Sequence, residues 1–280
     1  MKQVYRFRPI RFYVIVFSLT WLFWFAAAIV GRGGGAEGTV MTLMLLGLLV
    51  PSITALCTVA TSKSAALKRD LRNKLVGLFR VNLLQVGEAI VVFCGVIAAS
   101  ILLSTLCGQS LSQFSFVADF SFSIGGAPTL LLLVLTAFLE ELGWRGYAED
   151  SIAAYCSWWK ESLIFGVVWA LWHLPLFFIP GTYQANILQE SPWFMVNFFV
   201  SVMPMGFMFT WVYVKNQRSI LACMVFHFFV NLLQEEIAMT QVTKCVETLV
   251  LSGVAAVVVL CNREMFFSKK HIGDLLGENP

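Results

Sequence analysis

Six polar residues in apolar surroundings are the strongest candidates for chemistry in this sequence. They are Glu140, Glu141, Arg145, His173, His227 and Asn231. The first three fall in the stretch 137–147, at the end of the apolar segment 127–147. Ionisable side chains in such segments are costly, and they usually mark a functional site where partners satisfy them. The histidines and the asparagine are the partners that this chain supplies.

The spacing of these residues distinguishes a carboxylate that supports the site from one that faces the pocket. Successive residues of a helix point about 100° apart, so Glu140 and Glu141 cannot both face one point. Glu141 and Arg145 are four residues apart with the acid first, which favours an ion pair. We therefore expect Arg145 to hold Glu141, and Glu140 to face a pocket. His227 and Asn231 are also four apart and share a helix face.

One carboxylate, two imidazoles and a carboxamide suit the attack of water on an amide. Glu140 can act as a general base toward water, and His and Asn can donate hydrogen bonds to a developing oxyanion. A zinc site is the alternative, because His173, His227 and Glu140 are the ligand types of a catalytic zinc. No HExxH motif is present and Asn231 is a poor zinc ligand, so we predict a site without metal or other cofactor. Pro175 is expected to interrupt the helix beside His173.

The elements that position these residues are membrane helices. Of the 280 residues, 59% are hydrophobic and 12% are charged, against about 25% charged in a soluble domain. A span needs roughly 20 apolar residues, and eight segments qualify: 12–30, 39–60, 86–107, 127–147, 161–180, 193–214, 219–238 and 246–262. We predict an all-α bundle of about eight transmembrane helices that forms a single domain over residues 1–280, with its motif core at 137–231.

The distribution of basic residues predicts the orientation of this bundle. With the N-terminus inside, 17 of the 19 Lys and Arg residues fall on the inner side, as expected for cytoplasmic loops. Only Arg32 and Lys244 fall outside. At 1.5 Å per helical residue, the polar residues lie about 10–18 Å from the inner helix ends. We therefore predict that both termini and the active site face the cytoplasm.

Two further features concern the membrane surface. Residues 63–82 form a basic amphipathic helix, with Lys74 among its charged residues, that lies on the bilayer or rests on the cytoplasmic loops. Trp158, Trp159, Trp193 and Tyr213 fall at predicted span ends, where an interfacial aromatic belt is expected. The seven cysteines are scattered and indicate neither a zinc site nor a disulfide framework.

The motifs together resemble those of the CAAX-protease and bacteriocin-processing family of intramembrane proteases. That family carries EExxxR, FxxxH and HxxxN/D motifs on successive helices. Here they read Glu140-Glu141-x-x-x-Arg145, Trp169-x-x-x-His173 and His227-x-x-x-Asn231, with Trp169 in place of the usual Phe. The similarity is greatest to the branch that contains the Ras-converting enzyme and its archaeal homologues.

This resemblance implies an activity and a role for each residue. The reaction would remove the last three residues after a prenylated cysteine. Glu140 would activate water with the help of His173, His227 and Asn231 would stabilise the oxyanion, and Glu141 and Arg145 would support the site. The partners would be a prenylated CAAX protein or peptide and membrane lipid, without nucleic acid. The membrane would be the cell membrane of an archaeon or bacterium, or the endoplasmic reticulum of a eukaryote.

Other functions remain open from the sequence. A zinc-dependent intramembrane protease would use the same residues. A proton-coupled transporter would use the acids and histidines as a proton relay, although no inverted repeat is visible. A bacteriocin-immunity protein without catalytic activity would have little need for the complete polar set.

Overall fold

The computed structural model describes residues 5–117, 129–268, 272 and 276. These residues confirm the all-α prediction, and they contain no β-strand beyond an isolated bridge between Phe116 and Ile237. The helices are α1 (Pro9–Arg32), α2 (Glu37–Thr61), α3 (Ala65–Val76), η1 (Leu78–Arg80), α4 (Leu83–Ser104), η2 (Thr105–Cys107), η3 (Leu111–Gln113), α5 (Thr129–Gly143), η4 (Trp144–Ala148), α6 (Glu149–Ala153), α7 (Trp158–Trp172), η5 (Leu174–Phe178), α8 (Tyr183–Glu190), α9 (Pro192–Lys215), α10 (Ile220–Glu236), α11 (Gln241–Cys261) and α12 (Arg263–Phe267). Residues 127 and 128 of a predicted span, and the predicted inner-side residues Lys2, Lys269 and Lys270, lie outside the described residues.

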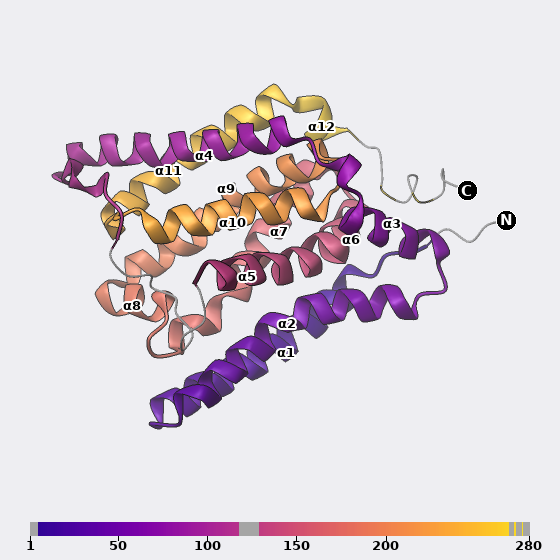
Figure 1. Ribbon diagram of the computed structural model, residues 1–280, viewed down its shortest axis with the longest axis horizontal. Helices are drawn as coiled ribbons and strands as arrows, with labels where there is room; N and C mark the ends of the chain where they lie inside the picture. Colours follow the sequence, from indigo (N-terminus) through magenta and orange to yellow (C-terminus); the bar gives the residue numbers. More distant parts are fainter. Residues whose placement is uncertain (1–4, 118–128, 269–271, 273–275, 277–280) are drawn as a thin grey trace.

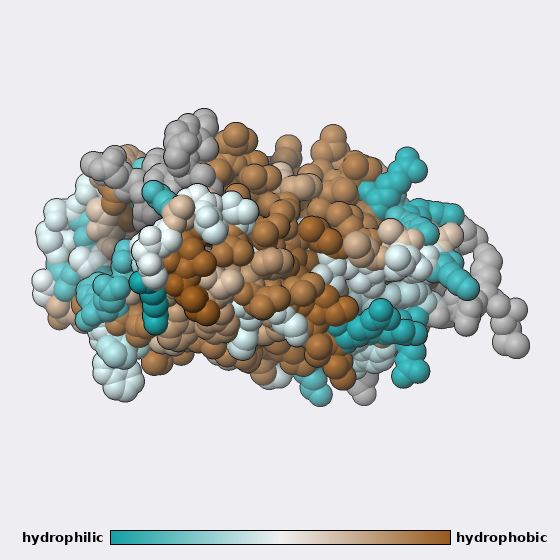
Figure 2. Space-filling view, turned by 90° about the horizontal axis from the view of Figure 1, so that it is seen from below, coloured by the Kyte–Doolittle hydropathy of each residue, from teal (hydrophilic) through white to brown (hydrophobic). Residues whose placement is uncertain are grey.

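The described chain is that of a multi-pass membrane protein. Six stretches of it are long and apolar enough to cross a membrane, namely α1, α2, α4 with η2, α7 with η5, α9 and α11. The predicted segments in α5 and α10 are helical but only 15 and 17 residues long, so the count of eight spans is not confirmed. Figure 2 shows hydrophobic side chains around the middle of the molecule and hydrophilic ones at both ends.

The helices form a bundle whose central members carry the polar motifs. Figure 1 shows α1 and α2 paired along one side, α4 and α11 along the other, and α5, α7, α9 and α10 between them. Helix α5 does not end at residue 147 as predicted. It continues through a π-helical stretch, η4, into α6, so the segment stays helical to Ala153. Arg145 is therefore enclosed, with 0% of its surface exposed, and is not a charged helix end at the membrane interface.

Small residues bring the central helices into direct contact. A Cβ added at Gly166 of α7 would lie 2.9 Å from the Cα of Met203 in α9. One added at Gly206 would lie 3.1 Å from the Cα of Gly166. On α5, a Cβ at Gly143 would lie 2.7 Å from the backbone carbonyl carbon of Pro51 in α2. Close approach of this kind is how membrane helices gain packing energy, and here it fixes the helices that carry the site.

Helix α3 packs against the protein, as one of the two alternatives for the amphipathic segment expects. Leu67 is 2% exposed and Lys74 only 1%, so Lys74 does not belong to the charged surface where the sequence placed it. Its Nζ donates to the carbonyls of Arg145 (2.9 Å) and Gly146 (3.0 Å) and to Asp150 Oδ2 (2.8 Å). An ammonium group has three donors, and here each one finds an acceptor. That is the condition under which a lysine can be buried.

The predicted aromatic belt is wrong for Tyr213. Its side chain is 0% exposed, and its hydroxyl lies 2.9 Å from Asp150 Oδ1 and 3.0 Å from the carbonyl oxygen of Arg145. Trp193, by contrast, is 76% exposed at the start of α9. A position near the end of a helix therefore does not by itself place an aromatic residue at the interface, because a buried acceptor can hold the hydroxyl inside.

Candidate active site

One cavity of about 600 Å³ brings together the four residues predicted to act directly. Glu140 comes from α5, His173 follows the last residue of α7, and His227 and Asn231 come from α10; all four line the cavity. Helix α7 ends at Trp172, and η5 begins with Leu174 and Pro175. The interruption predicted beside His173 is thus present.

Two indole groups orient the carboxylate of Glu140. The Nε1 of Trp169 donates to Glu140 Oε2 over 3.0 Å, and the Nε1 of Trp144 donates to the same oxygen over 3.3 Å. No described residue donates to Oε1, which leaves that oxygen for a molecule in the cavity. The family pattern has Phe where this chain has Trp169, so this donor belongs to this chain's own version of the motif. The residue type alone did not predict that it reaches Glu140.

Glu141 faces away from the cavity and holds two partners at once. Its Oε2 lies 3.1 Å from Arg145 Nε, and its Oε1 accepts from Arg145 Nη1 over 3.2 Å. The same Oε1 lies 2.8 Å from Nδ1 of His227. The predicted Glu141–Arg145 ion pair is present. The contact with His227 was not predicted, because sequence spacing relates residues only within one helix.

The hydrogen bonds of the two histidines define what each can do. Nδ1 of His173 lies 2.7 Å from the carbonyl oxygen of Trp169, and Nδ1 of His227 faces the Glu141 carboxylate. Both partners are acceptors, so each Nδ1 carries the proton. In a neutral imidazole the other nitrogen then has a lone pair and accepts. His227 can therefore donate to an oxyanion through Nε2 only when that nitrogen also carries a proton, and its role at the oxyanion stays a prediction.

A buried polar network supports the Glu141–Arg145 pair from behind. Arg145 Nε lies 3.1 Å from Glu149 Oε2, and the Thr210 hydroxyl lies 2.9 Å from Glu149 Oε1 and 3.2 Å from Glu161 Oε2. All of these side chains are 0% exposed. This network was not predicted, although Glu149 lies four residues after Arg145 and that spacing could have revealed it.

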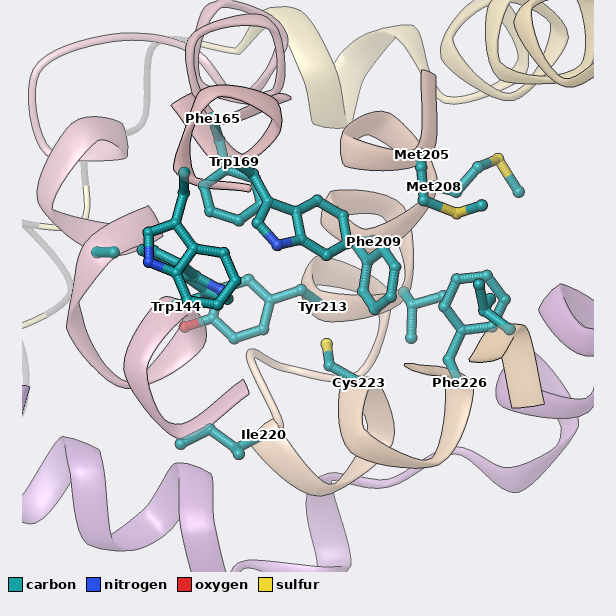
Figure 3. Packing of buried hydrophobic residues seen from close by; sticks show 14 of the residues in the cluster. Trp144, Phe165, Trp169, Met205, Met208, Phe209, Tyr213, Ile220, Cys223 and Phe226 are labelled. Atoms are coloured by element: carbon teal, nitrogen blue, oxygen red, sulfur yellow. The ribbon is translucent and has the colours of Figure 1, made fainter. Parts of the chain in front are cut away.

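Aromatic rings enclose the guanidinium group of Arg145. Its Cζ lies 4.7 Å from the ring centroids of both Phe165 and Phe209, close enough for cation–π attraction. Figure 3 shows Phe165, Trp169 and Phe209 gathered beside Trp144. These rings keep water away from the Glu141–Arg145 ion pair. The ion pair in turn holds the Glu141 carboxylate beside Nδ1 of His227.

The cavity contains ligand types that a catalytic zinc also uses, and the site without metal stays a prediction. Each histidine donates from Nδ1 to an oxygen and keeps Nε2 as an acceptor, which is also the state of a metal-binding histidine. A catalytic zinc takes three protein ligands. Among the described residues, no group of three or more His, Cys, Asp or Glu side chains is placed to hold a metal ion.

The cavity extends toward the end of the bundle where α2, α8 and α11 begin. Its lining includes Glu37 at the start of α2, Tyr183 at the start of α8 and Lys244 near the start of α11. These residues lie at the end of the bundle opposite to the beginning of α1 and the end of α11 (Figure 1). The lining alone does not assign the cavity to one side of the membrane, so the orientation with both termini and the active site toward the cytoplasm stays a prediction.

Comparison with known proteins agrees with this geometry. Residues 123–233 match the family model described as type II CAAX prenyl endopeptidase Rce1-like. The chain is 43% identical over 269 residues to CAAX prenyl protease 2 of Methanococcus maripaludis, an alignment that covers 96% of this chain and 99% of that protein. The fold, the polar cavity and these matches define an intramembrane endopeptidase. The chain belongs to the type II CAAX prenyl endopeptidase family.

Proposed function

We propose that this protein removes the C-terminal tripeptide from prenylated CAAX proteins or peptides by attack of a water molecule that Glu140 activates. The observation that carries this proposal is the meeting of Glu140, His173, His227 and Asn231 at one cavity, with the Glu140 carboxylate held by two indole donors. The printed name of the relative supports the substrate class. Membrane lipid surrounds the bundle, and the prenyl group of the substrate would enter from it.

Each step of this reaction has a candidate atom. Glu140 Oε1 takes a proton from water, and the water oxygen attacks the carbonyl carbon of the peptide bond after the prenylated cysteine. His173 assists as an acceptor through Nε2. The amide of Asn231 and Nε2 of protonated His227 donate to the oxyanion. The carbon–nitrogen bond then breaks, and the leaving amine receives the proton held by Glu140. Glu141 and Arg145 position His227.

The test uses purified protein in detergent with a farnesylated CAAX peptide. We expect cleavage that Glu140→Ala abolishes and Glu141→Ala weakens. Glu264→Ala is the matched control, because Glu264 is exposed in α12, outside the cavity, and this variant should cleave like the wild type. Cleavage that survives Glu140→Ala unchanged would overturn the assignment of Glu140 as the base.

A zinc-dependent reaction is the second candidate, because both histidines keep Nε2 as an acceptor. We propose a metal-free reaction, since the described residues offer two imidazoles without a grouped third ligand. The measurement is cleavage after treatment with a tight zinc chelator, with metal content verified by elemental analysis. Activity that persists in metal-free protein supports the proposal. Activity that is lost and then restored by added Zn²⁺ refutes it.

We further propose that both termini and the active site face the cytoplasm. The basic residues favour cytoplasmic termini, and a substrate protein made in the cytoplasm favours a cytoplasmic active site. Two native cysteines can assign the two ends of the bundle. Cys107, in η2 after α4, and Cys261, at the end of α11, are both exposed and lie at opposite ends of the bundle. A membrane-impermeant maleimide applied to intact cells should label Cys107 and not Cys261. Labelling of Cys261 in intact cells, or of neither cysteine in cells that label fully once permeabilised, contradicts the proposal.

A further inference from the structure

The cavity that holds the catalytic residues is lined by one basic side chain among many acidic and neutral ones. Among the described residues that line it, Lys244 is the only Lys or Arg, while Glu37, Glu140, Glu235 and Glu247 also line it. Lys244 is half-buried near the start of α11. In an otherwise acidic cavity, an anionic part of a ligand would bind at this ammonium group.

The ammonium of Lys244 contacts an aromatic ring and forms no close ion pair. Its Nζ lies 4.6 Å from the ring centroid of Tyr183, and it forms no ion pair with a carboxylate of the described residues. The nearest acid along the helix, Glu247, attracts the ammonium electrostatically without forming an ion pair, and it accepts from the side chain of Gln234 over 2.6 Å. A cation–π contact orients a lysine, but it leaves the three ammonium donors available to an anion.

Neighbouring groups add to the positive potential at this point. The hydroxyl of Tyr183 donates to Oε1 of Gln241 over 3.1 Å, which leaves the amide nitrogen of Gln241 as a further donor at the cavity wall. Lys244 lies in the first turn of α11, where the helix dipole favours negative charge. A carboxylate placed here would meet a cation, an amide donor and a positive helix end.

The distance from the catalytic residues matches the length of a tripeptide. Helices α10 and α11 run in opposite directions, and the hydrogen bond between Gln234 and Glu247 shows that these two residues lie at the same height along the bundle. Asn231 lies three residues before Gln234, and Lys244 lies three residues before Glu247. The distance along the bundle axis from Asn231 to Lys244 is therefore about 9 Å, and the distance from His227 to Lys244 is about 15 Å. Three extended residues span about 10–11 Å. A peptide whose scissile carbonyl lies between His227 and Asn231 therefore brings its terminus to Lys244.

We infer that Lys244 binds the C-terminal carboxylate of the substrate and thereby selects peptide bonds three residues from a free chain end. This inference rests on the proposed function. The ammonium forms a charge-assisted hydrogen bond with the carboxylate, with Gln241 beside it. A substrate that carries a neutral amide at the same position keeps its prenyl group and sequence but lacks the charge.

The experiment compares a farnesylated CAAX peptide as the free acid and as the C-terminal amide. Loss of a charge-assisted hydrogen bond should lower kcat/KM about tenfold to hundredfold, so the wild type should prefer the acid by about that factor. Lys244→Met should lower kcat/KM for the acid and abolish the preference, whereas Lys244→Arg should keep it. Lys160→Met is the matched control, because Lys160 is exposed at the other end of the bundle, and it should retain the wild-type preference.

The outcomes separate this inference from the proposed function. A wild type that cleaves neither peptide refutes the proposed function, and the inference with it. A wild type that cleaves both peptides equally well refutes only the role of Lys244. A Lys244→Met variant that retains the acid preference also refutes it. The ratio of the two rates is measured on the same sample, so a variant with less folded protein still gives a valid answer.

Discussion

Replacement of Lys74 by methionine tests how helix α3 is attached to the core. Methionine keeps the length of the side chain but removes the ammonium that contacts the carbonyls of Arg145 and Gly146 and the carboxylate of Asp150. Asp150 is only 1% exposed, so water does not replace the lost contacts. Removal of one partner from a buried pair costs about 3–5 kcal/mol. Arg218 remains 3.6 Å from Asp150 and offsets part of this, which places the expected loss near the lower figure.

The measurement is the free energy of unfolding in detergent, compared with Lys68→Met as the control. Lys68 lies on the exposed face of the same helix, and its replacement should change stability by no more than about 0.5 kcal/mol. Both variants remove one positive charge from one helix, so a general charge effect would move them alike. Equal stability of the two variants would show that the buried ammonium contributes nothing and would refute the reasoning.

Three further predictions concern the site, the packing and pH. Trp169→Phe removes the 3.0 Å donor to Glu140 but keeps a ring, so peptide cleavage should fall about twofold to tenfold; unchanged kcat would show that the donor does not position the carboxylate. Gly166→Ala should destabilise the protein by about 1–3 kcal/mol, since its Cβ would meet the α9 backbone, whereas Gly253→Ala, with open space around it, should not lower the thermal midpoint. Burial alone would raise the pKa of Asp70, but Lys74, Arg218 and Arg80 together outweigh burial and hold the pKa below its usual range. The stabilising contribution of Asp70 is therefore complete above about pH 4 and is lost as the pH falls further, so thermal midpoints measured from pH 7 to pH 3 should fall less in Asp70→Asn than in the wild type.

From the sequence, the residues that form the site could be predicted better than the contacts between them. Glu140, His173, His227 and Asn231 could be expected at one cavity, because charge in apolar helices needs partners and helical spacing says which residues share a face. The ion pair of Glu141 with Arg145 followed from the same spacing. These arguments rely on interactions within one helix or on the general cost of polar groups in a membrane.

The contacts between helices could not be predicted in this way. The bonds from Trp169 to Glu140 and from His227 to Glu141 depend on how separate helices are rotated, and no local pattern encodes that rotation. Lys74 was assigned to the surface because most lysines are there, and the two carbonyl groups and the Asp150 carboxylate that face it explain its burial. The count of eight spans stays a prediction, because the described parts of α5 and α10 are helical but only 15 and 17 residues long.

The position of Glu37, Tyr183 and Lys244 in the cavity lining has a consequence for how other domains can be attached to this protein. With α1 of 24 residues, the bundle is about 36 Å long, comparable with the thickness of a membrane. The beginning of α1 lies at the opposite end of the bundle from these three lining residues (Figure 1). A reporter domain attached ahead of α1 would therefore not cover this part of the cavity.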